Sequence, residues 1–100
     1  MKITGKKNIE AERLRGRAAV DAVYIPKINA AMGPKFALYQ LKALVAAEND
    51  SLFGDPDIIL TKHAGLIAEV SMIENQRQMA QAKIDAAKSA AEIDAIIAAL

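Results

Sequence analysis

The sequence predicts an all-α protein of four or five helices, organised as a small bundle on one long helix at about residues 66–88. These residues (LIAEVSMIENQRQMAQAKIDAAK) contain no proline and no glycine. Apolar residues recur there every three or four positions, as on one face of a helix: Leu66, Val70, Ile73, Ala80, Ile84 and Ala87. No stretch shows the alternation that is typical of a strand. A helix of this length spans roughly 35 Å, so other helices should pack along it.

The composition suits one small domain with a modest core. The chain has 100 residues, of which 53% are hydrophobic and only 4% aromatic. Alanine supplies much of the apolar fraction and buries little area per residue, so a bundle of this size often needs partners. We expect residues 1–7, which include three lysines, to form a flexible basic arm, and residues 8–100 to form a single helical domain.

The first helix should begin after Asn8, which is a suitable N-cap, and run toward Met32. Its expected apolar face is Leu14, Ala18, Ala22, Ile25 and Met32, broadened by Val20, Val23 and Ile28. Gly16 inside this pattern should cost about 1 kcal/mol relative to alanine. Pro26 removes a backbone donor, so a kink or break is expected near residues 24–25. Gly33 and Pro34 are a strong stop signal.

The second helix should start at Pro34 and end at about Glu48. Leu52 and Phe53 follow in a loop, and we expect both side chains to enter the core.

Two further helix starts have clear signals. Asp55-Pro56-Asp57 places an acidic cap before proline at the first helical position, and predicts a short helix to about His63. Gly65 either separates that helix from the long one or merely bends it. Ser89 and Glu92 match a capping box before a last helix over residues 90–100.

Catalytic and metal-binding patterns are weak. The chain has no cysteine, and its single histidine, His63, has no acid at a spacing that shares its helical face. Asp55 and Asp57 are better explained as caps than as metal ligands. Asp85, Glu92 and Asp94 lack a matching set of histidine or cysteine ligands. With no phosphate-binding loop or nucleophile motif either, we expect no enzyme, no cofactor, no metal site and no small-molecule substrate.

Charge is unevenly distributed along a chain whose net charge is +1. Arg13, Arg15 and Arg17 make the N-terminal end basic, whereas acids prevail from Glu48 onward. Such polarity either serves head-to-tail contact between copies or is only a solvated basic end. A nucleic-acid interface is disfavoured, because the arginines spread around a helix and no aromatic residue lies between them for stacking.

Arg77 interrupts the apolar face of the long helix. It either lies at the edge of that face and extends outward, or forms an interior ion pair with Glu74 or Glu48.

The last helix carries an apolar stripe of Ile93, Ile96, Ile97 and Leu100, at the spacing of one helical face. Chain ends usually fray unless they are held. The stripe should therefore dock on the long helix, contact a partner, or do both along different edges.

The N-terminal segment lacks the apolar core of a signal peptide, and no run approaches the roughly 18 apolar residues of a membrane span. We expect a soluble protein made in a cytosol, with no membrane partner.

Several segments resemble a class of small helical proteins of tailed bacteriophages and prophages that are associated with tail or tail-fibre genes. They are residues 17–22 (RAAVDA), 39–42 (YQLK), 46–48 (AAE), Pro56, 66–68 (LIA), 73–78 (IENQRQ) and 84–96 (IDAAKSAAEIDAI). The resemblance implies a non-enzymatic structural component of the virion, of the tail or its fibre attachment region, made in the bacterial host cytoplasm. Its partners would be other virion proteins and copies of itself. The alternatives are a cytosolic assembly chaperone, a head decoration protein, or a small nucleic-acid-associated protein that uses the basic N-terminus.

Overall fold

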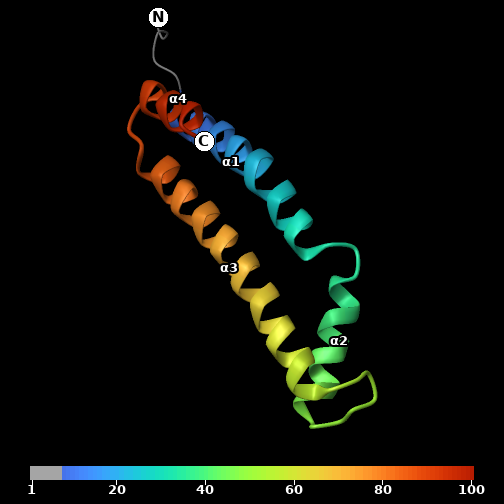
Figure 1. Cartoon of the computed structure of the whole chain (residues 1–100). Coiled ribbons are helices and arrows are strands. Elements are labelled where there is room, and N and C mark those ends of the chain that lie inside the picture. Colours follow the sequence, from blue (N-terminus) through green and yellow to red (C-terminus); the bar gives the residue numbers. More distant parts are fainter. Residues whose placement is uncertain (1–7) are drawn as a thin grey trace, which may run out of the picture. The chain divides into compact units, whose positions relative to one another are not determined.

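The computed structural model describes residues 8–100, and these form four α-helices and no strand (Figure 1). The helices are α1 (Ile9–Met32), α2 (Phe36–Ala47), α3 (Pro56–Ala86) and α4 (Ala90–Ala98). The predicted all-α class is confirmed. The predicted arm, residues 1–7, lies outside the described residues.

Local capping explains where three of the helices begin. Asn8 Oδ1 accepts the backbone N–H of Glu10 at 2.9 Å, and Asp55 Oδ1 accepts that of Asp57 at 2.9 Å. The Ser89 hydroxyl accepts the N–H of Glu92 at 3.2 Å. Each of these bonds satisfies a donor that the first turn of a helix leaves free, so the predicted N-caps are confirmed.

The helix breaks considered at Pro26 and Gly65 do not occur, whereas the alternatives of a kink near residues 24–25 and a bend at Gly65 stay predictions. Pro26 lies inside a continuous α1, and Gly65 lies inside α3, which therefore includes the predicted short helix and begins at Pro56. Proline removes one hydrogen bond, and glycine adds chain entropy. Neither effect ends the helix, because the backbone hydrogen bonds continue before and after each of these residues. The strong stop at Gly33 is confirmed, with a φ of 74° at the end of α1.

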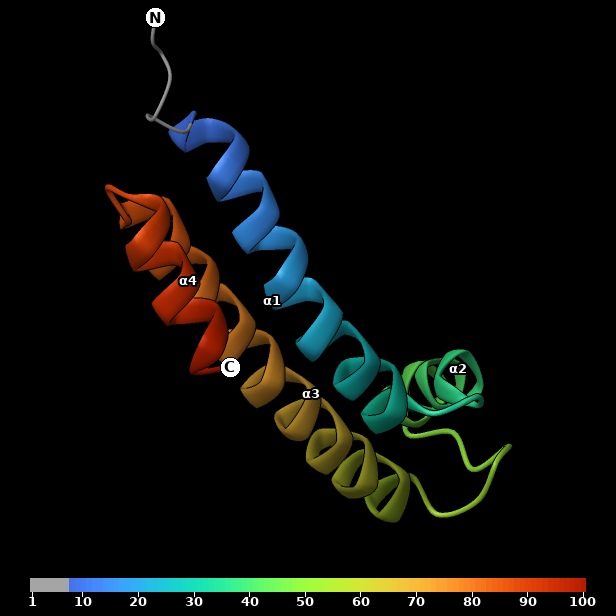
Figure 2. The ribbon, with the colours of Figure 1, turned by 90° about the horizontal axis from the view of Figure 1, so that it is seen from above.

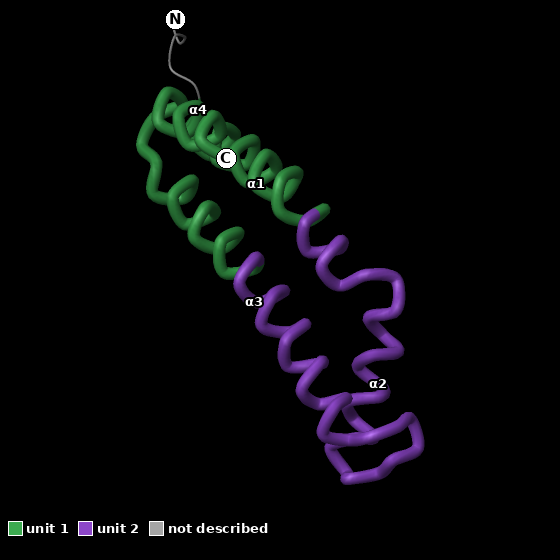
Figure 3. The backbone as a smooth tube through the Cα atoms, viewed as in Figure 1, with its two compact units in different colours: residues 1–26, 74–100 green, residues 27–73 purple. Residues whose placement is uncertain are grey.

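The described chain divides into two compact units, which share α1 and α3 (Figure 3). Unit 1 contains the chain up to Pro26 and residues 74–100, and unit 2 contains residues 27–73. A compact unit is not by itself an independent domain, so the single domain over residues 8–100 stays a prediction.

Unit 1 contains the main apolar core. Val20 of α1, Ile84 of α3 and Ile93 of α4 are fully buried, and Ala80 and Ala87 complete the cluster. Figure 2 shows α4 folded back along the C-terminal part of α3. The face predicted for the long helix is confirmed, because its first three members are half-buried and its last three are buried.

The face predicted for α1 is wrong at its centre and right at its edge, where Val20 is buried and Val23 and Ile28 are half-buried. Leu14 is 63% exposed and Ile25 is 40% exposed, while the buried residues of α1 are Gly16 and Val20. A β-carbon at Gly16 would lie 2.7 Å from Cδ1 of Ile84. Because Gly16 has no side chain, α1 can approach Ile84 of α3 and Ile93 of α4 closely. The side of α1 that carries Leu14 offers no such position, so it faces away from the core.

Candidate interaction surface

The three N-terminal arginines bind carboxylates and a carbonyl within unit 1. Arg13 pairs with Glu10 at 2.5 Å and donates to the carbonyl of Ala87 at 2.9 Å. Arg15 pairs with Glu12 at 2.7 Å and with Asp94 of α4 at 2.5 Å. These bonds orient α1 against the segments around it.

The hydrogen bonds that Arg15 donates to Glu12 and then to Asp94 raise the pKa of Arg15. Arg17 pairs with Asp85 of α3 at 2.6 Å. Acids from the C-terminal part of the chain thus neutralise two of the basic N-terminal side chains within one molecule. Within the described residues, two of the charges that suggested head-to-tail contact between copies are therefore paired inside unit 1, and the contact itself stays a prediction.

Arg77 pairs with Glu74, as the second alternative predicted, but it does so at the edge of the apolar face: the side chain of Arg77 is 25% exposed and that of Asp21 is 46% exposed. Its guanidinium binds both carboxylate oxygens of Glu74, at 2.6 and 2.9 Å, and Asp21 of α1 at 2.9 Å. Glu48, the other suggested partner, is not involved. Hydrogen bonds to Glu74 and then Asp21 raise the pKa of Arg77, and the bonds from Arg77 and then Gln78 lower the pKa of Glu74.

The stripe of α4 packs within its own unit. Ile93 is fully buried, and Ile96, Ile97 and Leu100 are partly buried against the core. This is the predicted docking on the long helix. Contact of its outer edge with a partner stays a prediction.

Unit 2 has a different surface, on which large apolar side chains are exposed to solvent. Among the described residues, twelve large apolar side chains are exposed, and nine of them belong to unit 2. We call these nine the unit 2 apolar surface: Leu38, Tyr39, Leu41, Leu44, Leu52, Phe53, Ile58, Leu60 and Met72. The buried residues of α2 are only Ala43 and Ala46, because alanines permit close contact and leave the leucines outside.

The expectation that Leu52 and Phe53 enter the core is therefore wrong. Leu52 is 71% exposed and Phe53 is 38% exposed. The sequence marked both as large apolar loop residues, but apolar character alone does not decide whether a loop folds inward. Their exposure is what brings them into a candidate interaction surface.

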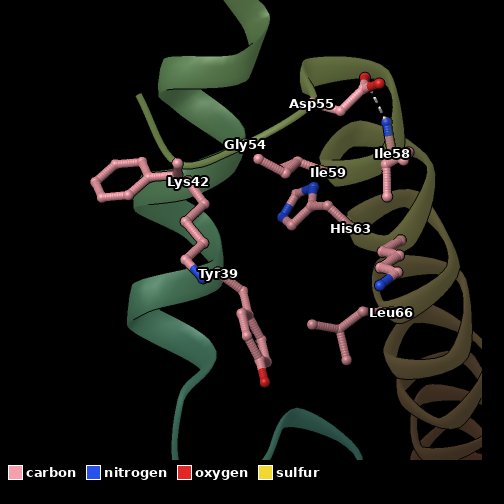
Figure 4. A pocket seen from close by; sticks show the side chains of 10 residues that line it. Tyr39, Lys42, Gly54, Asp55, Ile58, Ile59, His63 and Leu66 are labelled. Atoms are coloured by element: carbon pink, nitrogen blue, oxygen red, sulfur yellow. Dashed lines mark hydrogen bonds between the residues drawn. The ribbon is translucent and has the colours of Figure 1, made fainter. Parts of the chain in front are cut away.

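A cavity of about 480 Å³ opens within unit 2 between α2, α3 and the loop that joins them. Figure 4 shows Tyr39 and Lys42 of α2 facing Ile59, His63 and Leu66 of α3. We call this cavity the Tyr39–Leu66 pocket. Its remaining lining residues are Phe53, Gly54, Asp55, Ile58 and Lys62. The walls are mainly apolar, and two lysines supply positive charge.

His63 lies between this pocket and a shallower hollow that Ala43, Leu44 and Leu60 help to line. Its Nε2 is hydrogen-bonded to Oε1 of Gln40 on α2. The contact joins α2 to α3 and places no carboxylate beside the imidazole ring. Over residues 8–100 there is no cluster of three or more histidine, cysteine or acidic side chains that could hold a metal ion.

None of the helices formed by the described residues is long and apolar enough to cross a membrane. The chain was compared with protein-family models, with curated proteins and with solved structures, and none of the three comparisons found a match.

Proposed function

We propose that this chain is a non-enzymatic structural component of a tailed-bacteriophage particle, of the tail or its fibre attachment region, and that it binds other virion proteins through the unit 2 apolar surface. The observation that carries the binding role is the concentration of nine exposed large apolar side chains in residues 27–73. The phage particle as the place of action comes from the sequence resemblance.

The contrast between the two units supports a binding surface on unit 2. Unit 1 buries its isoleucines and pairs its arginines with carboxylates. On unit 2, Leu38, Leu41 and Leu44 follow one another at three-residue steps along α2 and remain 40–69% exposed. Removing such side chains from water is favourable, at ~25 cal/mol per Å² of apolar area, so a partner that covers them gains binding energy.

The arginines give less support to the nucleic-acid alternative. Arg15 and Arg17 are engaged with Asp94 and Asp85, so phosphate contacts would have to displace these carboxylates. The favoured role is therefore a protein-binding one, in a particle assembled in the host cytoplasm.

Mass spectrometry of purified particles tests this role. We expect the chain at a stoichiometric copy number in the tail fraction. Its presence in assembly intermediates but not in finished particles would instead indicate a chaperone. Recovery with separated heads would indicate a decoration protein.

A pair of matched double variants tests the surface. Leu41→Gln with Leu44→Gln alters unit 2, and Leu14→Gln with Ile25→Gln alters α1 of unit 1; all four side chains are 40–69% exposed. Glutamine preserves helix propensity. We expect only the unit 2 variant to lose incorporation into particles. Equal incorporation of both variants would contradict the proposed surface.

A further inference from the structure

The loop between α2 and α3 is an ordered turn that displays one leucine. Asp50 Oδ1 accepts the N–H of Leu52 at 2.9 Å, and the carbonyl of Ser51 accepts the N–H of Gly54 at 3.0 Å. Gly54 has a φ of 121°, which glycine adopts without strain. These bonds hold the backbone around Leu52, whose side chain is 71% exposed, the most exposed of the large apolar residues described.

The Tyr39–Leu66 pocket lies on the same unit and can receive such a side chain. Tyr39, Ile58 and Leu66 give it apolar walls, and its volume of about 480 Å³ exceeds what one leucine fills. Lys42 and Lys62 border it, and neither forms an ion pair with any residue in the described part of the chain. Asp55 also lines the pocket, and its Oδ1 accepts the N–H of Asp57 and of Ile58, so the two lysines exceed the one carboxylate and the pocket suits an apolar residue that is close to a second carboxylate.

The turn supplies this combination. Leu52 is two residues from Asp50, which is exposed and forms no ion pair with the described residues. Since the projecting leucine and the pocket belong to one chain, a two-fold axis between two copies would fill both pockets at once. Unit 2 has four lysines and five acidic residues, so two such surfaces repel each other little.

We propose that two copies of this chain associate through unit 2, each inserting Leu52 into the Tyr39–Leu66 pocket of the other, with Lys42 and Lys62 facing Asp50 of the opposite copy. This inference rests on the proposed role of unit 2 as a binding surface, and it names a second copy as the partner.

Sedimentation equilibrium of the purified full chain over a range of concentrations tests the association. We expect a monomer–dimer equilibrium in which Leu52→Gln raises the dissociation constant at least about tenfold. Leu14→Gln, which changes a leucine 63% exposed on unit 1, should leave it unchanged. Circular dichroism would verify that both variants keep their helices.

A disulfide trap tests the geometry, because the chain has no cysteine of its own. Protein carrying Leu52→Cys is mixed with protein carrying Ile58→Cys and oxidised. The expected product is the mixed 52–58 disulfide, which forms only when the two β-carbons come within about 4.5 Å. Leu52→Cys mixed with Leu14→Cys is the control and should give no mixed product.

Three results would overturn the inference: a monomer at every concentration, a dimer insensitive to Leu52→Gln, or equal trapping in the control pair. Incorporation of Leu41→Gln with Leu44→Gln into particles separates this failure from that of the proposed function. If that variant is excluded from particles while the chain is monomeric, unit 2 binds a different virion protein and only the self-association is wrong.

Discussion

Replacing Gly16 with alanine should destabilise the protein, although alanine is the better helix former. The added β-carbon would lie 2.7 and 2.8 Å from Cδ1 and Cγ2 of Ile84 and 3.1 Å from Cγ2 of Ile93. Both isoleucines are fully buried, and β-branched side chains have few alternative rotamers. The core can accept the methyl group only if α1 moves away or Ile84 leaves its position.

The magnitude follows from two opposing effects. Alanine in a helix interior gains about 1 kcal/mol over glycine, whereas overpacking a well-filled core costs about 1–3 kcal/mol. The net change should be a loss of up to ~2 kcal/mol in the free energy of unfolding. Gly65 is the matched control, because it lies inside α3 with no atom within 4 Å of an added β-carbon. Gly65→Ala should stabilise the protein by about 0.5–1 kcal/mol.

Urea unfolding followed by far-ultraviolet circular dichroism would compare the two variants. Ile84→Val removes Cδ1, the atom closest to the new methyl group, and by itself costs about 0.5–1.5 kcal/mol. In the Gly16→Ala protein this second change should cost less, since it relieves the contact. If Gly16→Ala stabilised the protein as much as Gly65→Ala does, the close approach of α1 to Ile84 would be refuted.

Three further predictions concern the cap, the ion pair and the last helix. Asp55→Ala should lower the free energy of unfolding by about 0.5–2 kcal/mol, because the N–H of Asp57 loses its acceptor; an unchanged urea midpoint would argue against the cap. Arg77 lowers the pKa of Glu74 in the folded state, so this carboxylate stabilises the fold above the ordinary glutamate pKa of about 4.3, and the contribution is lost as the pH falls through the lowered value. Glu74→Gln should therefore flatten the acid limb of a plot of thermal midpoint against pH, and an unchanged limb would contradict the ion pair. Deleting residues 95–100 removes Ile96, Ile97 and Leu100, which pack against the core, and should cost at least about 2 kcal/mol; wild-type stability of the truncated chain would show that these three residues contribute nothing to unit 1.

Features that depend on neighbouring residues could be predicted from the sequence alone. Asn8, Asp55 and Ser89 cap helices because their side-chain oxygens reach donors two or three residues away, whatever the rest of the chain does. The spacing of Ile84 and Ala87 identified the buried face of α3, and the spacing of the α4 stripe identified its packed side. The all-α class follows from the same periodicity.

Only the tertiary structure decided which face of α1 is buried. Alanines lie on several sides of α1, so a broad apolar face fits its sequence; the prediction centred that face on Leu14 and placed Val20 at its edge. The structure buries the side that carries Gly16 and Val20, because Gly16 lets the backbone of α1 approach Ile84 and Ile93. In the sequence alone, Gly16 indicated only a loss of helix stability. Leu52 is the reverse case: its apolar character indicated the core, but the turn bonded to Asp50 holds it in solvent. Burial depends on which surfaces meet across distant parts of the chain, and periodicity along one helix does not contain that information.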